Sequence, residues 1–171
     1  RVTHSFPDYA DMAVALGHGD SIVSMGLPSR FHTDHYDELD GVGVDTGSLT
    51  KLNGDSGIDK EIFYELNADL HLIDPQWLIH NSFFGLDEDD VTELTDNVAP
   101  FVGNTIFRRT DGWHDYRYYT LYEAFETVAQ VHRERGRFEA FRDLHDAFLA
   151  DVQADLPPAD ERPNALLTFA A

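Results

Sequence analysis

The stretch SGIDKEIFYELNADLHLID, which runs from Ser56 to Asp74, changes from a helical pattern to a strand pattern and so decides the fold class. Ser56, followed three residues later by Asp59, predicts the start of a helix. The apolar residues that form one face of this helix are Ile58, Ile62, Phe63 and Leu66. After a turn at Asn67-Ala68-Asp69, the residues that predict a buried strand ending at Pro75 are Leu70, Leu72 and Ile73.

Helices and strands alternate on both sides of this stretch. Strands are predicted at Val2–Phe6, at Ser21–Met25, weakly at Val42–Val44, and at the sheet edge at Asn104–Phe107. Helices are predicted from Tyr9 to Leu16, after the turn Pro7-Asp8, and from Asp87, as N-cap, towards Val98.

Two long helices follow in the last third of the chain. The first begins near Tyr118 and breaks at Gly136, and the second covers Arg137–Leu156. Asn164–Ala170 then predicts a further strand. Because strands alternate with helices along the chain, the sequence predicts an α/β fold with a mostly parallel sheet.

The composition is strongly acidic. The 171 residues contain 32 Asp plus Glu and 12 Lys plus Arg, for a formal net charge of -20. Such a surface repels nucleic acid. Hydrophobic content of 42% argues against a disordered acidic protein. We therefore expect a folded protein from a high-salt environment, where screening reduces self-repulsion.

The chain contains no cysteine, which excludes disulfides, thiolate metal sites and cysteine nucleophiles within it. No apolar run approaches the roughly 20 residues that span a bilayer. The sequence opens directly on a strand pattern at Val2, from which we expect a processed or trimmed N-terminus.

The segment Glu65–Ile73, ELNADLHLI, is similar to a signature of the class III solute-binding proteins of ABC importers. In that group, which delivers iron-siderophores, haem and cobalamin to a permease, the signature reads roughly I-x-L-x-P-D-L-V-I, so Ala68 replaces the usual proline. The resemblance implies a three-layer α/β lobe over residues 1–117 and a helical pair over 118–156 that includes an interlobe connecting helix. It also implies the truncated start of a second lobe over 157–171.

The same resemblance implies a function without catalysis. The protein is expected to be an extracytoplasmic, membrane-associated transport component, anchored through an N-terminal segment absent from this sequence. It would bind a ferric-siderophore, haem or cobalamin between two lobes, without an intrinsic cofactor. The expected partner is an ABC permease, and the full-length protein is expected to be a monomer.

Loops that follow the strands of a parallel sheet are where ligands bind, so the first candidates lie after Val2–Phe6. Asp8 and Tyr9 begin the next helix, whose N-terminal backbone N–H groups suit an anionic ligand. Asp8 is equally well explained as a helix cap.

The loop after Ser21–Met25 supplies Arg30, which suits a carboxylate or the negative charge of a ferric chelate. His32 and His35 suggest a weaker hypothesis, a zinc, manganese or iron site. An ordinary solvated loop explains the spacing of these histidines at least as well.

Two further loops supply one candidate each. Ser48, in Thr46-Gly47-Ser48, offers a small polar group to a ligand, although a flexible connection explains the loop equally well. Trp77 follows the strand that ends at Pro75 and suits stacking on a planar or apolar ligand. Packing beneath the next helix is the alternative for Trp77.

A basic and aromatic segment stands out in this acidic chain, at residues 108–119. Its candidate ligand contacts are Arg108, Arg109, Trp113 and Tyr116. Arginine and aromatic side chains together suit anionic catecholate or hydroxamate iron complexes. A structural role, with the arginines bridging nearby acids, is the alternative.

Other function classes stay open at this point. A metal-ion (Zn, Mn or Fe) transport protein is the first alternative, and a chelatase-like enzyme with His114 and Asp115, or His32 and Asp34, as an acid–base pair is the second. A pure interaction domain is the third. No nucleophile elbow, P-loop or dinucleotide fingerprint supports catalysis, so we expect no enzyme.

Overall fold

Four short parallel strands form one sheet in the computed structural model, which describes residues 1–4, 6–106 and 112–165. The strands are β1 (Val2–His4), β2 (Ile22–Met25), β3 (Thr50–Lys51) and β4 (Leu70–Leu72). Their order across the sheet is β3-β2-β1-β4, and each neighbouring pair is parallel. The predicted α/β fold with a parallel sheet is therefore confirmed.

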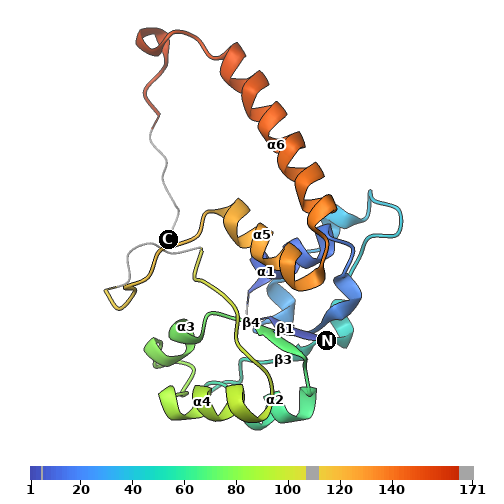
Figure 1. Ribbon diagram of the computed structural model, residues 1–171, viewed down its shortest axis with the longest axis vertical. Coiled ribbons are helices and arrows are strands. Elements are labelled where there is room, and N and C mark those ends of the chain that lie inside the picture. The colour runs from blue at the N-terminus through green and yellow to red at the C-terminus, as the bar shows by residue number, and fades with distance from the viewer. Residues whose placement is uncertain (5, 107–111, 166–171) are drawn as a thin grey trace. The chain divides into compact units, whose positions relative to one another are not determined.

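Helices cover both faces of this sheet, which gives three layers (Figure 1). One face carries α1 (Pro7–Ala15) and α5 (Leu121–His132), which pack on each other. The other carries α2 (Glu61–Leu66), α3 (Pro75–His80) and α4 (Glu88–Asn97). The remaining helices are α6 (Arg135–Asp155) and the short 3₁₀ turns η1 (Gly19–Ser21), η2 (Pro28–Arg30), η3 (Asp34–Tyr36), η4 (Thr46–Ser48) and η5 (Ala159–Glu161).

Strands β2 and β3 are added on one side of β1, and β4 is added on the other side. The chain passes from β1 through α1 to β2 and then β3 on one side, and it returns through α2 to place β4 on the other side of β1. The crossovers α1 and α2 therefore lie on opposite faces. At such a switch point the loops after the two strands separate and leave a crevice beyond their carboxyl ends.

Strands β1, β2 and β4 are largely buried, as expected where helices cover both faces of a parallel sheet, whereas both residues of β3 are exposed. The core on the α2–α4 side consists of Leu52, Ile58, Phe63, Leu66, Ile73, Trp77, Leu78, Phe84, Leu86, Val91 and Leu94. Two histidines also lie in the strands without solvent exposure, His4 in β1 and His71 in β4. His71 Nδ1 and Thr3 Oγ1 share a hydrogen bond of 2.6 Å between adjacent strands.

Two predicted strands are wrong. Residues Val42–Val44 are irregular, with the Val42 N–H donating to the Leu39 carbonyl, and the third strand is the two-residue β3 further along. The described part of Asn104–Phe107 is not a strand either, and Phe107 lies outside the described residues. On the outer side of β4, the sheet is extended only by an isolated parallel bridge between His71 and Phe101 among the described residues. Asn104 lies outside this pairing and makes its hydrogen bonds elsewhere.

Several predicted helix boundaries also need correction. Ser56 does not start a helix, because Gly54 and Gly57 pair with each other and α2 begins only at Glu61. The first long helix starts at Leu121 with Thr120 as N-cap, not near Tyr118. It ends where Arg133 adopts a left-handed conformation with φ 61°, so Gly136 lies inside α6.

The stretch Asp74–Trp77 was predicted to be a loop, and that prediction is wrong. Asp74 caps α3 by accepting the Gln76 N–H at 3.0 Å. Pro75 occupies the first turn, where its missing N–H costs nothing. Trp77 is therefore held on a helix.

The chain forms two compact units, Arg1–Phe138 and Glu139–Ala171. The helix predicted at Arg137–Leu156 is present as α6, and its role as an interlobe connection stays a prediction. In the predicted strand Asn164–Ala170, Asn164 and Ala165 are not in a strand and the rest lies outside the described residues. The division into a lobe, a helical pair and the start of a second lobe stays a prediction.

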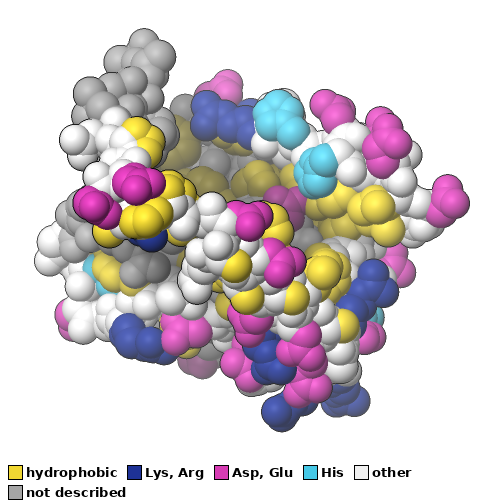
Figure 2. Space-filling model, turned by 90° about the horizontal axis from the view of Figure 1, so that it is seen from above, with side chains coloured by type: hydrophobic (Ala, Val, Ile, Leu, Met, Phe, Trp, Pro, Cys, Tyr) yellow, Lys and Arg dark blue, Asp and Glu magenta, His cyan; other side chains and the backbone are white. Residues whose placement is uncertain are grey.

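The acidic side chains are spread over the surface. Figure 2 shows Asp and Glu side chains distributed over the visible face, instead of gathered in one patch. Of the described Asp and Glu residues, only Asp74 is buried. None of the described helices combines the length and apolarity needed to cross a bilayer.

The predicted cap of α4 is confirmed. Asp87 Oδ1 accepts the Asp90 N–H at 2.9 Å, and Asp90 Oδ2 accepts the Asp87 N–H at 3.2 Å. Two N-terminal donors are thus satisfied reciprocally.

Replacing Asp87 by alanine should lower the free energy of unfolding by about 1 kcal/mol, because the cap is lost. Asp89→Ala is the matched control, since it removes one exposed carboxylate from the same turn without touching the cap. Denaturant unfolding followed by circular dichroism measures both variants. Equal effects of the two substitutions would contradict the capping argument.

Candidate ligand-binding site

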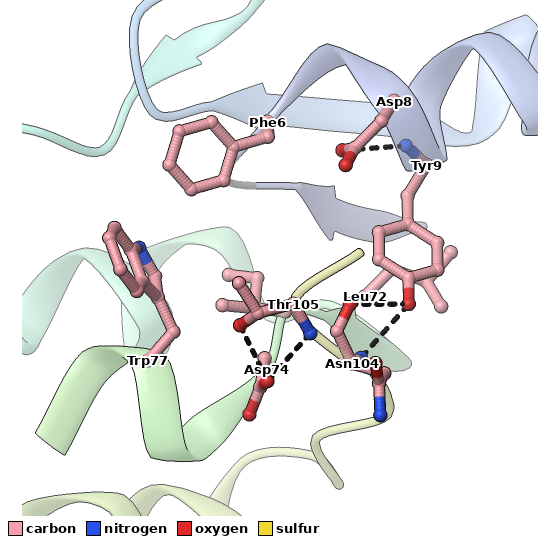
Figure 3. Close-up of a pocket in the computed structure, with 9 residues that line it drawn as sticks. Phe6, Asp8, Tyr9, Leu72, Asp74, Trp77, Asn104 and Thr105 are labelled. Atoms are coloured by element: carbon pink, nitrogen blue, oxygen red, sulfur yellow. Dashed lines mark hydrogen bonds between the residues drawn. The ribbon is translucent and has the colours of Figure 1, made fainter. Parts of the chain in front are cut away.

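A cavity lies at the switch point between β1 and β4, just beyond their carboxyl ends. Its volume is about 20 Å³, enough for about one water molecule or one small polar group. The residues that line it are Phe6, Asp8, Tyr9, Leu72, Ile73, Asp74, Trp77, Asn104 and Thr105. Figure 3 shows Phe6 and Asp8 on one side of the cavity and Trp77 and Asp74 on the other. The place is the one where parallel α/β sheets bind ligands.

Asp74 holds this region together. Its Oδ1 caps α3, while its Oδ2 accepts the Thr105 N–H at 2.8 Å and the Thr105 hydroxyl at 2.6 Å. The Tyr116 hydroxyl also donates to Oδ2. One buried carboxylate therefore ties two segments that are distant in sequence, at Thr105 and Tyr116, to the end of β4.

Tyr9 fixes the same loop from the opposite side. Its hydroxyl accepts the Asn104 N–H and donates to the Asn104 carbonyl, both at 2.9 Å (Figure 3). Burial, the largest cause, raises the pKa of Tyr9, so its hydroxyl stays protonated as a donor. The Asn104 side chain then accepts the Tyr119 N–H at 3.0 Å and donates to the Arg117 carbonyl at 2.8 Å.

The approach of this loop to β4 depends on Gly103. A Cβ at that position would lie 2.6 Å from the Ile73 carbonyl carbon and 2.7 Å from the Asp74 nitrogen. Such contacts require the backbone to move. Only glycine therefore lets residues 104 and 105 reach Tyr9 and Asp74.

One backbone N–H in the first turn of α1 is taken by an acid of the same helix. Asp8 Oδ1 accepts the Tyr9 N–H at 2.9 Å. Burial raises the pKa of Asp8, and the nearby charge of Asp11 raises it further, against the lowering effect of the Tyr9 hydrogen bond. An anion at this end of α1 would meet a carboxylate.

Aromatic rings form one wall of the site. The centroids of Phe6 and Trp77 are 6.0 Å apart in an edge-to-face arrangement. Trp113 lies 6.3 Å from Trp77 and stacks on His80 at 5.2 Å. This edge-to-face and stacked geometry extends the apolar surface of the cavity outwards to Trp113.

The structure brings together five of the predicted site residues. Asp8, Tyr9 and Trp77 line the cavity, Tyr116 donates to Asp74, and Trp113 lies beside Trp77. The burial expected as the alternative for Trp77 is also present, since its side chain is only 7% exposed and belongs to the core.

Two predicted site residues lie elsewhere. Arg30 is exposed in η2 and does not line the cavity. Ser48 is exposed in η4, which precedes β3, and it lines a hollow with Ile22 at the start of β2. Ser48 therefore lies at the opposite end of the strands, because the strand expected before it does not form. Arg108 and Arg109 lie outside the described residues.

For the weak metal-site hypothesis, the structure shows one contact between possible metal ligands. His35 Nε2 lies 3.9 Å from Asp11 Oδ1, while His32 is exposed in the preceding loop. In residues 1–4, 6–106 and 112–165, no three His, Asp or Glu side chains are placed so that they could hold a metal ion together.

Six of the nine lining residues were not predicted as site residues: Leu72 and Ile73, which were assigned to the core of a strand, and Phe6, Asp74, Asn104 and Thr105. Phe6 is the last residue of the predicted strand Val2–Phe6 and Asp74 lies at the end of the strand before Pro75, so their position at strand ends was a usable signal. Asn104 and Thr105 were assigned to a strand, which hid them. Gly103 just before them was the sign that the backbone makes a close approach there.

Comparison with known proteins supports the fold. No protein-family model and no curated protein matches the chain. The crystal structure of Staphylococcus aureus SirA is similar to it, with a TM-score of 0.54 and 15% sequence identity. The match covers 91% of this chain and 47% of the SirA chain, so this chain spans about half the length of that protein. At this identity the likeness concerns the fold, and the chain has the α/β fold of about half of the SirA structure.

Proposed function

We propose that this chain is the N-terminal lobe of an extracytoplasmic solute-binding protein of an ABC importer. Its ligand would be an iron-siderophore or a related iron or tetrapyrrole complex. The observation that carries the proposal is the aromatic cavity at the β1–β4 switch point, built from Phe6, Tyr9 and Trp77. The fold shared with about half of SirA supports it as well.

The proposed mechanism is binding between two lobes, without turnover. This lobe offers a wall of aromatic rings, and the hydrogen bonds of Asp74 and Tyr9 hold the loop of Asn104 and Thr105 in place before ligand arrives. A preorganised wall limits the entropy lost on binding. A second lobe would close over the ligand as a rigid body, and the closed form would dock on the permease.

Intrinsic fluorescence tests this proposal directly, because both tryptophans of the chain belong to the site. Trp77 lines the cavity and Trp113 lies 6.3 Å from it. We expect saturable quenching when the full-length protein, in high salt, is titrated with a ferric hydroxamate, a ferric catecholate, haem or cobalamin. Trp77→Phe should remove most of the signal and weaken binding.

Free Zn²⁺, Mn²⁺ and Fe³⁺ provide the contrasting titration. Tight binding of a bare ion that is lost in His32→Ala would replace this proposal with a metal-ion carrier. A quench that does not saturate, or that free N-acetyltryptophanamide shows equally, would count against any chelate site.

A further inference from the structure

The described lining of the cavity is acidic and contains no basic side chain. Its ionisable acids are Asp8 and Asp74, and none of its described residues is lysine, arginine or histidine. The ion pairs among the described residues involve neither carboxylate. A ligand that enters this cavity therefore meets negative charge without a described counter-ion.

The two carboxylates differ in how far their charge is already satisfied. Asp74 accepts hydrogen bonds on both oxygens, from Gln76, Thr105 and Tyr116. Asp8 has fewer donors: its Oδ1 accepts the Tyr9 N–H, and its own backbone N–H is the other donor that favours the charged form. Its pKa is raised by burial and by Asp11, which means that its negative charge is poorly compensated in the protein alone.

Aromatic rings share the cavity with Asp8. Phe6, Tyr9 and Trp77 all line it, and Figure 3 shows Phe6 on the same side of the cavity as Asp8, with Trp77 across from them. The faces of such rings attract cations, most strongly where water is excluded. A carboxylate beside three aromatic rings is a combination that suits an ammonium group.

One backbone N–H at the start of each of the two helices is already taken by an acid in this cavity. The Tyr9 N–H at the start of α1 is bonded to Asp8, and the Gln76 N–H at the start of α3 is bonded to Asp74. An anionic complex would have to displace these carboxylates or lie beside them. Either arrangement is unfavourable in a partly desolvated site.

We infer that this cavity binds a positively charged group of its ligand, with Asp8 as the counter-ion. This inference rests on the proposed function and narrows its ligand class. A ferric trihydroxamate that carries a free primary ammonium is favoured, and a ferric tris-catecholate, with its triple negative charge, is disfavoured.

Three ferric chelates distinguish the effect of ligand charge from the effect of ligand shape. The first is ferrioxamine B, a ferric trihydroxamate with one free ammonium, and the second is its N-acetylated form, which has the same iron coordination and no ammonium. The third is a ferric tris-catecholate. In the full-length protein we expect ferrioxamine B to bind about tenfold more tightly than its acetylated form, which corresponds to about 1.4 kcal/mol, and the catecholate to bind most weakly.

Asp8→Asn is the decisive variant. Its amide oxygen can still accept the Tyr9 N–H, so this hydrogen bond in the first turn of α1 is kept while the cavity loses the charge. The tenfold preference for the ammonium form should disappear. Asp89→Asn, an exposed acid at the start of α4, is the matched control and should keep the preference, since it changes net charge without changing the site. Titrations in 1 M salt, where the Debye length is about 3 Å, suppress long-range attraction to the acidic surface.

The outcomes distinguish this inference from the proposed function. If the chelates bind but ferrioxamine B and its acetylated form have equal affinities, or if the catecholate binds most tightly, the cation preference is wrong while the solute-binding function stands. If Asp89→Asn abolishes the preference as Asp8→Asn does, the effect comes from net charge and not from the cavity. If none of the chelates binds saturably, the proposed function itself fails.

Discussion

Asp74→Ala is expected to lower the free energy of unfolding by about 3 kcal/mol and to abolish chelate-dependent quenching. The substitution removes the cap of α3 and leaves the buried Thr105 N–H and hydroxyl without their acceptor. Hydrogen bonds to a charged group contribute about 1.5–3 kcal/mol, and an unsatisfied buried donor adds its own desolvation cost. The loop of Asn104 and Thr105 and the Tyr116 hydroxyl would lose their anchor at the end of β4.

Asp45 provides a matched control for that experiment. Its Oδ1 accepts the Gly47 N–H at 3.1 Å, two residues further on, as Asp74 Oδ1 does for Gln76, but Asp45 is exposed and accepts no buried donor. Asp45→Ala should therefore cost no more than about 1 kcal/mol. Urea unfolding and the fluorescence titration give both quantities. Similar unfolding free energies for the two variants would contradict the central structural role of Asp74.

The alternation of helices and strands could be predicted because the local spacing of apolar residues differs between helices and strands. Leu70, Leu72 and Ile73 follow an amphipathic helix, and the observed α2 and β4 lie within the stretch Ser56–Asp74. The order of the strands could not be predicted. It depends on which side of β1 the crossover α2 returns, and no local pattern encodes that side.

Errors in the strands led directly to errors in the site. Because β3 has only two residues, both exposed, it leaves almost no apolar signature, and the run at Val42–Val44 took its place. Ser48 was consequently placed after a strand when it precedes one. Asp8, Tyr9 and Trp77 were found because the strands before them, β1 and β4, were correctly located.

The role of Asp74 lay beyond sequence reasoning for a different reason. In a chain with 32 Asp and Glu residues, the type alone carries little information. Its distinction is that it is buried and accepts hydrogen bonds from Thr105 and Tyr116, which are distant in sequence. Only tertiary structure brings those donors to it.

Mild acid is expected to destabilise this protein strongly, between about pH 6.5 and pH 4.5, through the buried histidines of the sheet. Burial lowers the pKa of His4 to about 3, with a further lowering from His132, and burial lowers the pKa of His71 to about 4. In the unfolded chain both imidazoles have the ordinary value of 6.5 and take up protons first. Stability is therefore fully present above pH 6.5 and falls by about 1.4 kcal/mol per pH unit for each histidine, or about 5 kcal/mol in total over this window.

Other ionisable groups also affect the free energy of unfolding between pH 6.5 and pH 4.5. Burial and the neighbouring His18 lower the pKa of His132 as well, which adds to the loss. Most carboxylates take up protons at lower pH, so relief of the acidic self-repulsion comes later. The pH dependence of the unfolding free energy, measured by denaturant titration from pH 7.5 to pH 4.5, therefore reports chiefly on the histidines.

The substitution His4→Leu isolates the contribution of one histidine to this pH dependence. Neither ring nitrogen of His4 has a hydrogen-bond partner among the described residues, so an apolar side chain should cost little at pH 7.5. His71 is less suitable, because leucine there would strand the Thr3 hydroxyl. The variant should lose about 1.4 kcal/mol less per pH unit than the parent below pH 6.5, whereas His32→Leu, at an exposed position, should keep the parental slope. A parental slope in His4→Leu would mean that His4 is already protonated in the folded protein, and that the acid sensitivity arises outside β1.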